Sequence, residues 1–198
     1  TASAPTAPVS LRFSIGPASC STAYGVAGAS MWIDASDLDA DANTANDPAL
    51  NSSVQLAVDK TGSAHDFESQ SGNQPTVVSS ASFGKNVLRF TTTQWMRQLD
   101  NFPAPTTIIY IARQRTSSYG RILQGGANNW LLGWHSSLEE RGYFEGWVSG
   151  QSAVSAQRPR VMSAVIRGTG QNTDFAVDGI VKASNAGGVT GPNGLAIN

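Results

Sequence analysis

Residues 121–147, RILQGGANNWLLGWHSSLEERGYFEGW, decide the fold of this chain. Three short runs rich in apolar and aromatic residues are separated by Gly-Gly-Ala-Asn and by Ser-Ser-Leu-Glu-Glu-Arg, two sequences typical of turns and loops. Short runs between turn residues predict an antiparallel meander of three strands, with residues 136–141 as a loop. The expected strands are Arg121–Gln124, Asn129–Trp134 and Gly142–Val148.

The same stretch supplies the candidate ligand-binding residues. Successive side chains of a strand point to opposite faces. The large rings here occupy both of the alternating sets of positions, so we expect some of them in a core and others on the open face or rim. The alternative that all of them are core residues stays open, because large rings are mostly buried. The candidates for ligand binding are Trp130, Trp134, His135, Tyr143 and Trp147.

The composition favours a single β-rich domain. A chain of 198 residues is long enough to bury a sizeable core, and only 14% of its residues are charged. The net charge of -1 provides no basic field for nucleic acid, and the apolar runs are too short to span a membrane. Cys20 is the only cysteine, so it forms no internal disulfide and leaves the redox compartment open.

The rest of the chain repeats the pattern of short strands and turns. Thr106–Ala112, TTIIYIA, is the strongest strand signal, and its almost continuous apolar character predicts burial on both faces. Asp178-Gly179 predicts a tight hairpin with a type I′ turn. Short strands at intervals of about 8 to 12 residues predict an all-β sandwich or jelly roll. Further strands are expected at Leu11–Ile15, Met31–Asp34, Val54–Val58, Gln74–Val78, Val87–Phe90 and Val161–Ile166.

Several short motifs follow one another within Ser30–Ile197: Met31–Asp37, Val58–Gly62, Asp66-Phe67, Gln74–Thr76, Asn86–Phe90 and Val177–Gly179. With these motifs in this order, the chain resembles the concanavalin A-like (laminin G-like) jelly-roll domains of the bacterial surface-protein type. The resemblance implies a two-sheet antiparallel jelly-roll sandwich in an extracellular or cell-surface protein, with a virion surface as an alternative. It does not imply one function, since this architecture hosts lectins, adhesins, glucanases and structural parts.

The two ends of the chain raise a question of strand pairing. Residues 1–10 are rich in Ala, Thr and Pro and are expected to form a linker or arm, with 11–198 as one jelly-roll domain. Relatives continue beyond a segment like Gly194–Ile197 into a closing strand, whereas this sequence stops at Asn198. The candidate to cover the resulting edge is Val9–Ile15, paired with its own sheet or with another copy in a homo-oligomer or filament.

An acidic segment follows the first of these motifs. Asp37, Asp39, Asp41 and Asn43 place oxygen ligands two residues apart, a spacing that can turn several oxygens onto one Ca²⁺ ion. The segment is not an EF-hand, because alanine and proline stand where that loop needs glycine and glutamate. A calcium site and a solvated acidic loop both remain open.

Enzymatic chemistry has little support in the sequence. Glycosidases need two carboxyl groups across a cleft, and Glu139, Glu140 and Glu145 do not show the strand pattern of the family's glucanases. His65 and His135 lack metal-ligand spacing. We therefore expect a non-catalytic extracellular module for glycan binding or adhesion. The alternatives are a self-assembling component of a surface layer, filament or virion and, third, a polysaccharide-active enzyme.

Overall fold

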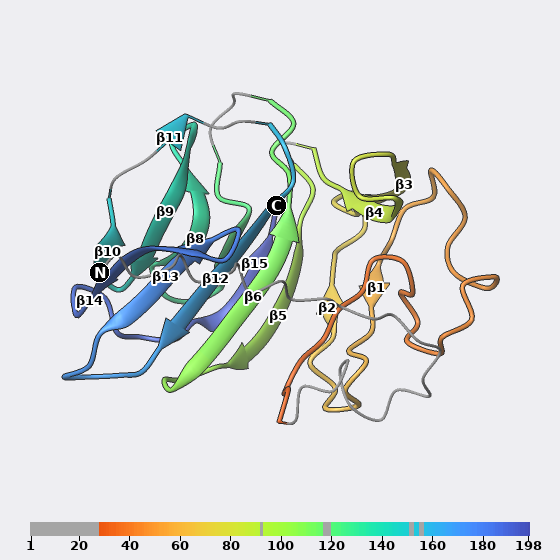
Figure 1. Ribbon diagram of the computed structural model, residues 1–198. Coiled ribbons are helices and arrows are strands. Elements are labelled where there is room, and N and C mark those ends of the chain that lie inside the picture. Colours follow the sequence, from red (N-terminus) through yellow and green to blue (C-terminus); the bar gives the residue numbers. More distant parts are fainter. Residues whose placement is uncertain (1–27, 92, 117–119, 151–152, 155–156) are drawn as a thin grey trace, which may run out of the picture.

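A computed structural model describes residues 28–198 apart from residues 92, 117–119, 151–152 and 155–156. Within these residues the protein is all-β, with antiparallel strands and no helix, so none that could cross a membrane (Figure 1). The strands are β1 (Leu56–Ala57), β2 (Phe67–Glu68), β3 (Thr76–Ser80), β4 (Lys85–Arg89), β5 (Met96–Asn101), β6 (Thr106–Ala112), β7 (Leu123–Gly125), β8 (Trp130–His135), β9 (Leu138–Phe144), β10 (Trp147–Ser149), β11 (Ala153–Val154), β12 (Arg160–Ile166), β13 (Thr173–Val177), β14 (Ile180–Asn185) and β15 (Asn193–Ile197).

The strands form two large sheets and one separate hairpin. The nine-stranded sheet has the order β1-β2-β5-β15-β7-β8-β9-β10, and β11 also pairs with β9. The four-stranded sheet has the order β14-β13-β12-β6, and β3 pairs only with β4. The C-terminal strand β15 lies between β5 and β7 and pairs with both, so it has no free edge.

The two large sheets pack against each other in a sandwich-like arrangement (Figure 1). The Tyr110 hydroxyl of β6 donates a hydrogen bond to the carbonyl oxygen of Leu132 in β8 across the interface, at 2.5 Å. The nine-stranded sheet contributes Trp130, Leu132, Trp134 and Phe144 to the core, and the four-stranded sheet contributes Met162, Ala164, Ile166, Phe175 and Val177.

Burial follows the period of two that a half-buried strand requires. In β12 the alternate residues from Arg160 to Ile166 are buried, and the residues between them are more exposed. The prediction that Thr106–Ala112 is buried on both faces is wrong, although its bounds coincide with β6. Ile109 is 66% and Ile111 60% exposed, because β6 lies in an outer sheet that is covered on one face only.

The aromatic meander exists, but its turns differ from those expected. Ser136 and Ser137 both have positive φ, 53° and 63°, and form a two-residue hairpin connection, so β9 begins at Leu138. Residues 138–141, expected in a loop, therefore belong to a strand. A turn at Glu145-Gly146 then divides the expected third strand into β9 and β10.

Other local expectations had mixed outcomes. The hairpin at Asp178-Gly179 is confirmed, with φ values of 51° and 78°. Met31–Asp34 is not a strand; the backbone N–H of Trp32 donates instead to the Asp59 carboxylate at 2.9 Å. Strands β2 and β5 were not expected from the sequence. The predictions for residues 1–15 and for Cys20 lie outside the described residues.

Candidate functional site

Two of the predicted ligand-binding tryptophans lie in the core. Trp130 is fully buried and Trp134 is 1% exposed, and each faces the four-stranded sheet. Trp134 meets Tyr110 of β6 edge to face, with the ring centroids 6.2 Å apart. Neither indole can therefore contact a ligand at the surface, and both are removed from the candidate site.

The other three predicted residues come together on the outer face of the nine-stranded sheet. Tyr143 of β9 is paired with Trp147 of β10, and their rings make an edge-to-face contact at 5.0 Å. His135 of β8 lies 6.3 Å from the same indole. Trp147 is 42% exposed, so it presents part of a large ring to solvent. These three residues, with Arg141, are called the platform below.

Arginine gives the platform a positive character. The Arg141 guanidinium stacks over the Trp147 ring, 4.4 Å from its centroid. Burial lowers the pKa of His135, and the charges of Arg121 and Arg141 lower it further. Two guanidinium groups therefore disfavour a further positive charge on the imidazole. The sequence analysis did not select Arg141, because its contact with Trp147 depends on the pairing of β9 with β10.

The predicted metal ligands lie in a loop of successive tight turns. The backbone N–H of Asn43 donates to the Asp41 carboxylate at 2.7 Å, and that of Ala45 donates to the Asn43 side-chain oxygen at 3.3 Å. Ala40 and Ala42 have positive φ, 62° and 65°, which bends the chain between the acidic residues. Oxygen atoms from Asp37, Asp39 and Asp41 consequently lie within 4.8 Å of one another.

Two buried carboxylate oxygens of this loop have no hydrogen-bond partner among the described residues. Asp37 is 4% exposed; its Oδ2 forms an ion pair with Lys60, whereas its Oδ1 is buried without a partner. Oδ2 of Asp47 is also buried without a partner, although sequence analysis had not selected this residue. Desolvation raises the pKa of Asp39, and the charges of Asp41 and Asp47 add to that rise. The loop thus brings several carboxylates together, of which Asp37 is ion-paired with Lys60.

Two of the three glutamates considered for catalysis, Glu139 and Glu140, belong to an ion-pair network between the sheets. Glu139 of β9 is 1% exposed, and its Oε1 lies 2.5 Å from a guanidinium nitrogen of Arg160 in β12. Glu140 pairs with Lys182 of β14 at 2.9 Å. The expectation that both residues lie in a loop is wrong, because β9 contains them. His65 lies in the segment between β1 and β2, and its Nδ1 is 2.7 Å from Oδ2 of Asp100 in β5.

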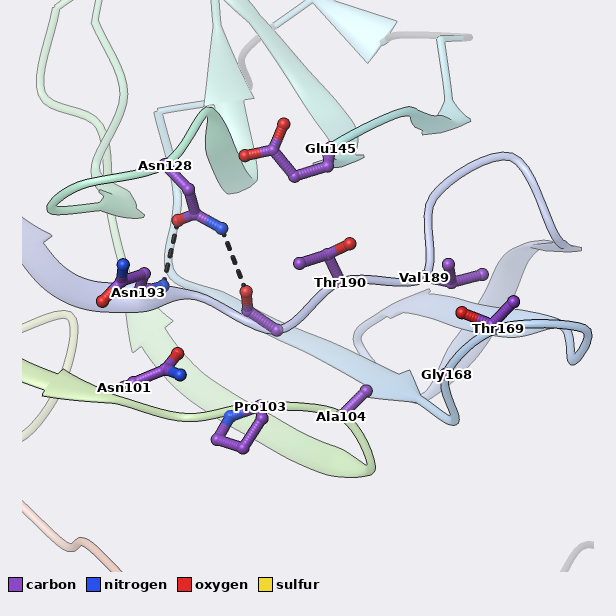
Figure 2. Close-up of a pocket in the computed structure, with 11 residues that line it drawn as sticks. Asn101, Pro103, Ala104, Asn128, Glu145, Gly168, Thr169, Val189, Thr190 and Asn193 are labelled. Atoms are coloured by element: carbon purple, nitrogen blue, oxygen red, sulfur yellow. Dashed lines mark hydrogen bonds between the residues drawn. The ribbon is translucent and has the colours of Figure 1, made fainter.

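A separate depression of about 450 Å³ lies where five loops meet (Figure 2). Asn128 connects two of these loops: its amide nitrogen donates to the Gly191 carbonyl oxygen at 3.1 Å, and its amide oxygen accepts from the Asn193 N–H at 3.0 Å. Glu145 and Thr169 also line the depression. Its lining mixes polar residues with Pro103, Ala104 and Val189, and none of the described residues that line it is aromatic or cationic, so it lacks a surface on which a sugar ring could stack.

Comparison with known proteins adds no assignment. No protein-family model matches the chain, and neither the curated proteins nor the solved structures contain a match to it.

Proposed function

We propose that this protein is a non-catalytic extracellular module that binds a glycan, for recognition or adhesion, through the platform. The observation that carries the proposal is the exposed ring of Trp147. Tyr143 contacts this ring edge to face, and the Arg141 guanidinium lies over it. Aromatic rings with an apolar body and polar neighbours suit the alternating C–H and O–H groups of sugars. The proposal includes the concanavalin A-like jelly roll expected from the sequence, and the all-β, sandwich-like architecture is the coarser feature that supports it.

The test is binding of Trp147→Ala to a glycan array. We expect the variant to lose the ligands of the wild-type protein and to keep its melting temperature within a few degrees, because the ring is partly exposed. Ile109→Ala is the matched control: it also removes an exposed apolar side chain, but from the four-stranded sheet, and should bind as the wild type does. A wild-type protein without any ligand on a broad array would refute the proposal.

We further propose that the acidic loop binds Ca²⁺, with Asp37, Asp39, Asp41 and Asp47 as oxygen ligands. The buried Oδ1 of Asp37 supports this, because a buried carboxylate oxygen without a partner is costly unless a cation or donor compensates it. The amide oxygen of Asn43, the fourth residue of the predicted set, accepts a backbone hydrogen bond as Oδ1 of Asp41 does, and each oxygen keeps a second lone pair for a cation. Bound calcium would stabilise the native loop rather than take part in chemistry.

Calcium binding should be visible in thermal unfolding. At a concentration 100 times the Kd, a ligand bound only by the native state adds about 2.7 kcal/mol, which raises the melting temperature of a domain of this size by about 5 to 10 °C. Asp39→Asn should abolish the response to calcium, whereas Glu68→Gln, which removes an exposed carboxylate elsewhere, should retain it. Equal melting temperatures in calcium and in chelator would refute this assignment.

Self-assembly is the second candidate function, and one observation favours it. The outer face of the four-stranded sheet exposes Ile109, Ile111 and Val181, and β6 pairs with no described strand on its other edge. Exposed apolar faces and free edges promote association between copies of a chain. Light scattering after size-exclusion chromatography tests this: an assembly that Ile111→Asp converts to monomers would support it, and a wild-type monomer at high concentration would exclude it.

A further inference from the structure

A second tryptophan–arginine pair lies on the same sheet face as the platform. The Arg97 guanidinium of β5 lies over the Trp95 ring, 4.9 Å from its centroid. Met96 and Gln98 are buried on the inner side of the strand, so the alternation of side chains places Trp95 and Arg97 on the outer face. This arrangement repeats the contact between Arg141 and Trp147.

The strand register connects the two pairs through one row of residues. Each residue of the row is the cross-strand partner of the next, so the row runs straight across β5, β15, β7, β8, β9 and β10. Five steps between neighbouring strands give a length of about 24 Å. Both ends are exposed, and Leu131 in the middle is buried. The row consists of Arg97, Ala196, Gln124, Leu131, Tyr143 and Trp147.

The surface is hollowed at the Trp95 end. A depression of about 390 Å³ lies between Trp95 and the end of β7, lined also by Arg97, Gln124 and Asn198. Gly125 and Gly126 line it too. A ligand could therefore sit beside Trp95 without displacing any side chain.

Arginines supply positive charge at both ends of this face, and Glu68 supplies a negative charge beside one of them. Arg121 and Arg141 both act on His135, and no carboxylate contributes to the shift of its pKa. Arg97 supplies a positive charge at the other end, with Glu68 as its cross-strand neighbour. The whole chain has a net charge of -1, so this positive face is a local feature. Three arginines are too few for the continuous basic stripe that long nucleic acids require.

We propose that the outer face of the nine-stranded sheet is an extended binding site for an acidic polysaccharide, with one Trp–Arg subsite at each end of the row. This inference rests on the proposed function and specifies its substrate class. A guanidinium binds carboxylates and sulfates through paired hydrogen bonds, and the neighbouring indole stacks on the sugar ring. A separation of about 24 Å requires an oligosaccharide of several units to reach both subsites.

The test compares acidic glycans with neutral counterparts of the same backbone. Polygalacturonate and its methyl ester provide the carboxylate pair, and dextran sulfate and dextran provide the sulfate pair. We expect binding of at least one acidic member, at least tenfold weaker binding of its neutral counterpart, and weakening by salt. Arg141→Gln should weaken acidic binding about tenfold, because it removes a charged hydrogen-bond donor. Arg113→Gln, on the four-stranded-sheet side, is the matched control and should bind normally.

A length series of the bound glycan separates the two subsites. Trp95→Ala should weaken binding of a hexasaccharide several-fold and leave binding of a disaccharide at Trp147 nearly unchanged. Equal binding of the hexasaccharide by Trp95→Ala and by the wild type would overturn the extended site. Binding of neutral members only would overturn the acidic class and leave the proposed function standing, whereas tighter binding of single-stranded oligo-dT than of any glycan would overturn the polysaccharide itself. Absence of all binding would refute this inference and the proposed function together.

Discussion

Replacing Arg160 by methionine should lower the free energy of unfolding by about 3 to 5 kcal/mol, the cost of removing one partner from a buried ion pair. The guanidinium lies 2.5 Å from Oε1 of Glu139 and 2.5 Å from Oδ2 of Asp178. The Glu139 side chain is only 2% exposed, so it would keep a buried negative charge that has lost its main counter-ion. Asp178 is 32% exposed and can be solvated in the variant, so Glu139 accounts for most of the loss.

Urea denaturation and thermal unfolding measure this effect. For a domain of this size, 3 to 5 kcal/mol corresponds to a decrease in melting temperature of about 6 to 20 °C. Arg158→Met is the matched control, because the Arg158 side chain is 57% exposed and pairs with Asp178 at 3.5 Å, and it should cost less than about 1 kcal/mol. The double variant Arg160→Met, Glu139→Gln should recover part of the loss, since it removes the buried charge.

Two results would refute this reasoning. A loss below 1 kcal/mol for Arg160→Met would mean that Glu139 is compensated by other groups or is less buried than described. A double variant less stable than Arg160→Met alone would mean that the carboxylate stabilises the fold independently of Arg160.

Three further predictions concern residues that hold the fold together. Trp134→Ala should destabilise the protein by about 3 to 5 kcal/mol, because it leaves a cavity in the core; a change below 1 kcal/mol in denaturant unfolding would contradict its burial. Burial alone would raise the pKa of Asp59, but hydrogen bonds from the backbone N–H groups of Thr61 and Trp32 lower it. The folded state thus favours the ionised carboxylate, so Asp59→Asn should cost about 2 kcal/mol at pH 7, and this difference should shrink as the pH falls below about 4; a pH-independent difference would argue against the charge. Tyr110→Phe should cost about 1 kcal/mol in the same assay through loss of the inter-sheet hydrogen bond, and equal stability would show that this bond contributes nothing.

Local patterns in the sequence determined the all-β class and several of its elements. The bounds of Thr106–Ala112 coincide with β6, and Asp178-Gly179 forms the expected hairpin, because β-branched runs and residues that tolerate positive φ act over a few neighbouring positions. The proximity of Asp37, Asp39 and Asp41 also follows from local turns, since their spacing of two residues lets each turn bring the next carboxylate to the same side.

Only the tertiary structure decided which residues of these elements reach the surface. Trp134 follows a register shift after Gly133 in β8 and enters the core, whereas Trp147 begins β10 after the turn at Glu145-Gly146 and stays exposed, although their sequence surroundings are similar. The burial of Glu139 against Arg160 and the row from Arg97 to Trp147 depend on pairings between strands far apart in the chain. The sequence determines the period of each strand, but strand partners and sheet faces are selected by how much apolar area the whole chain can bury at once, and no short stretch contains that information.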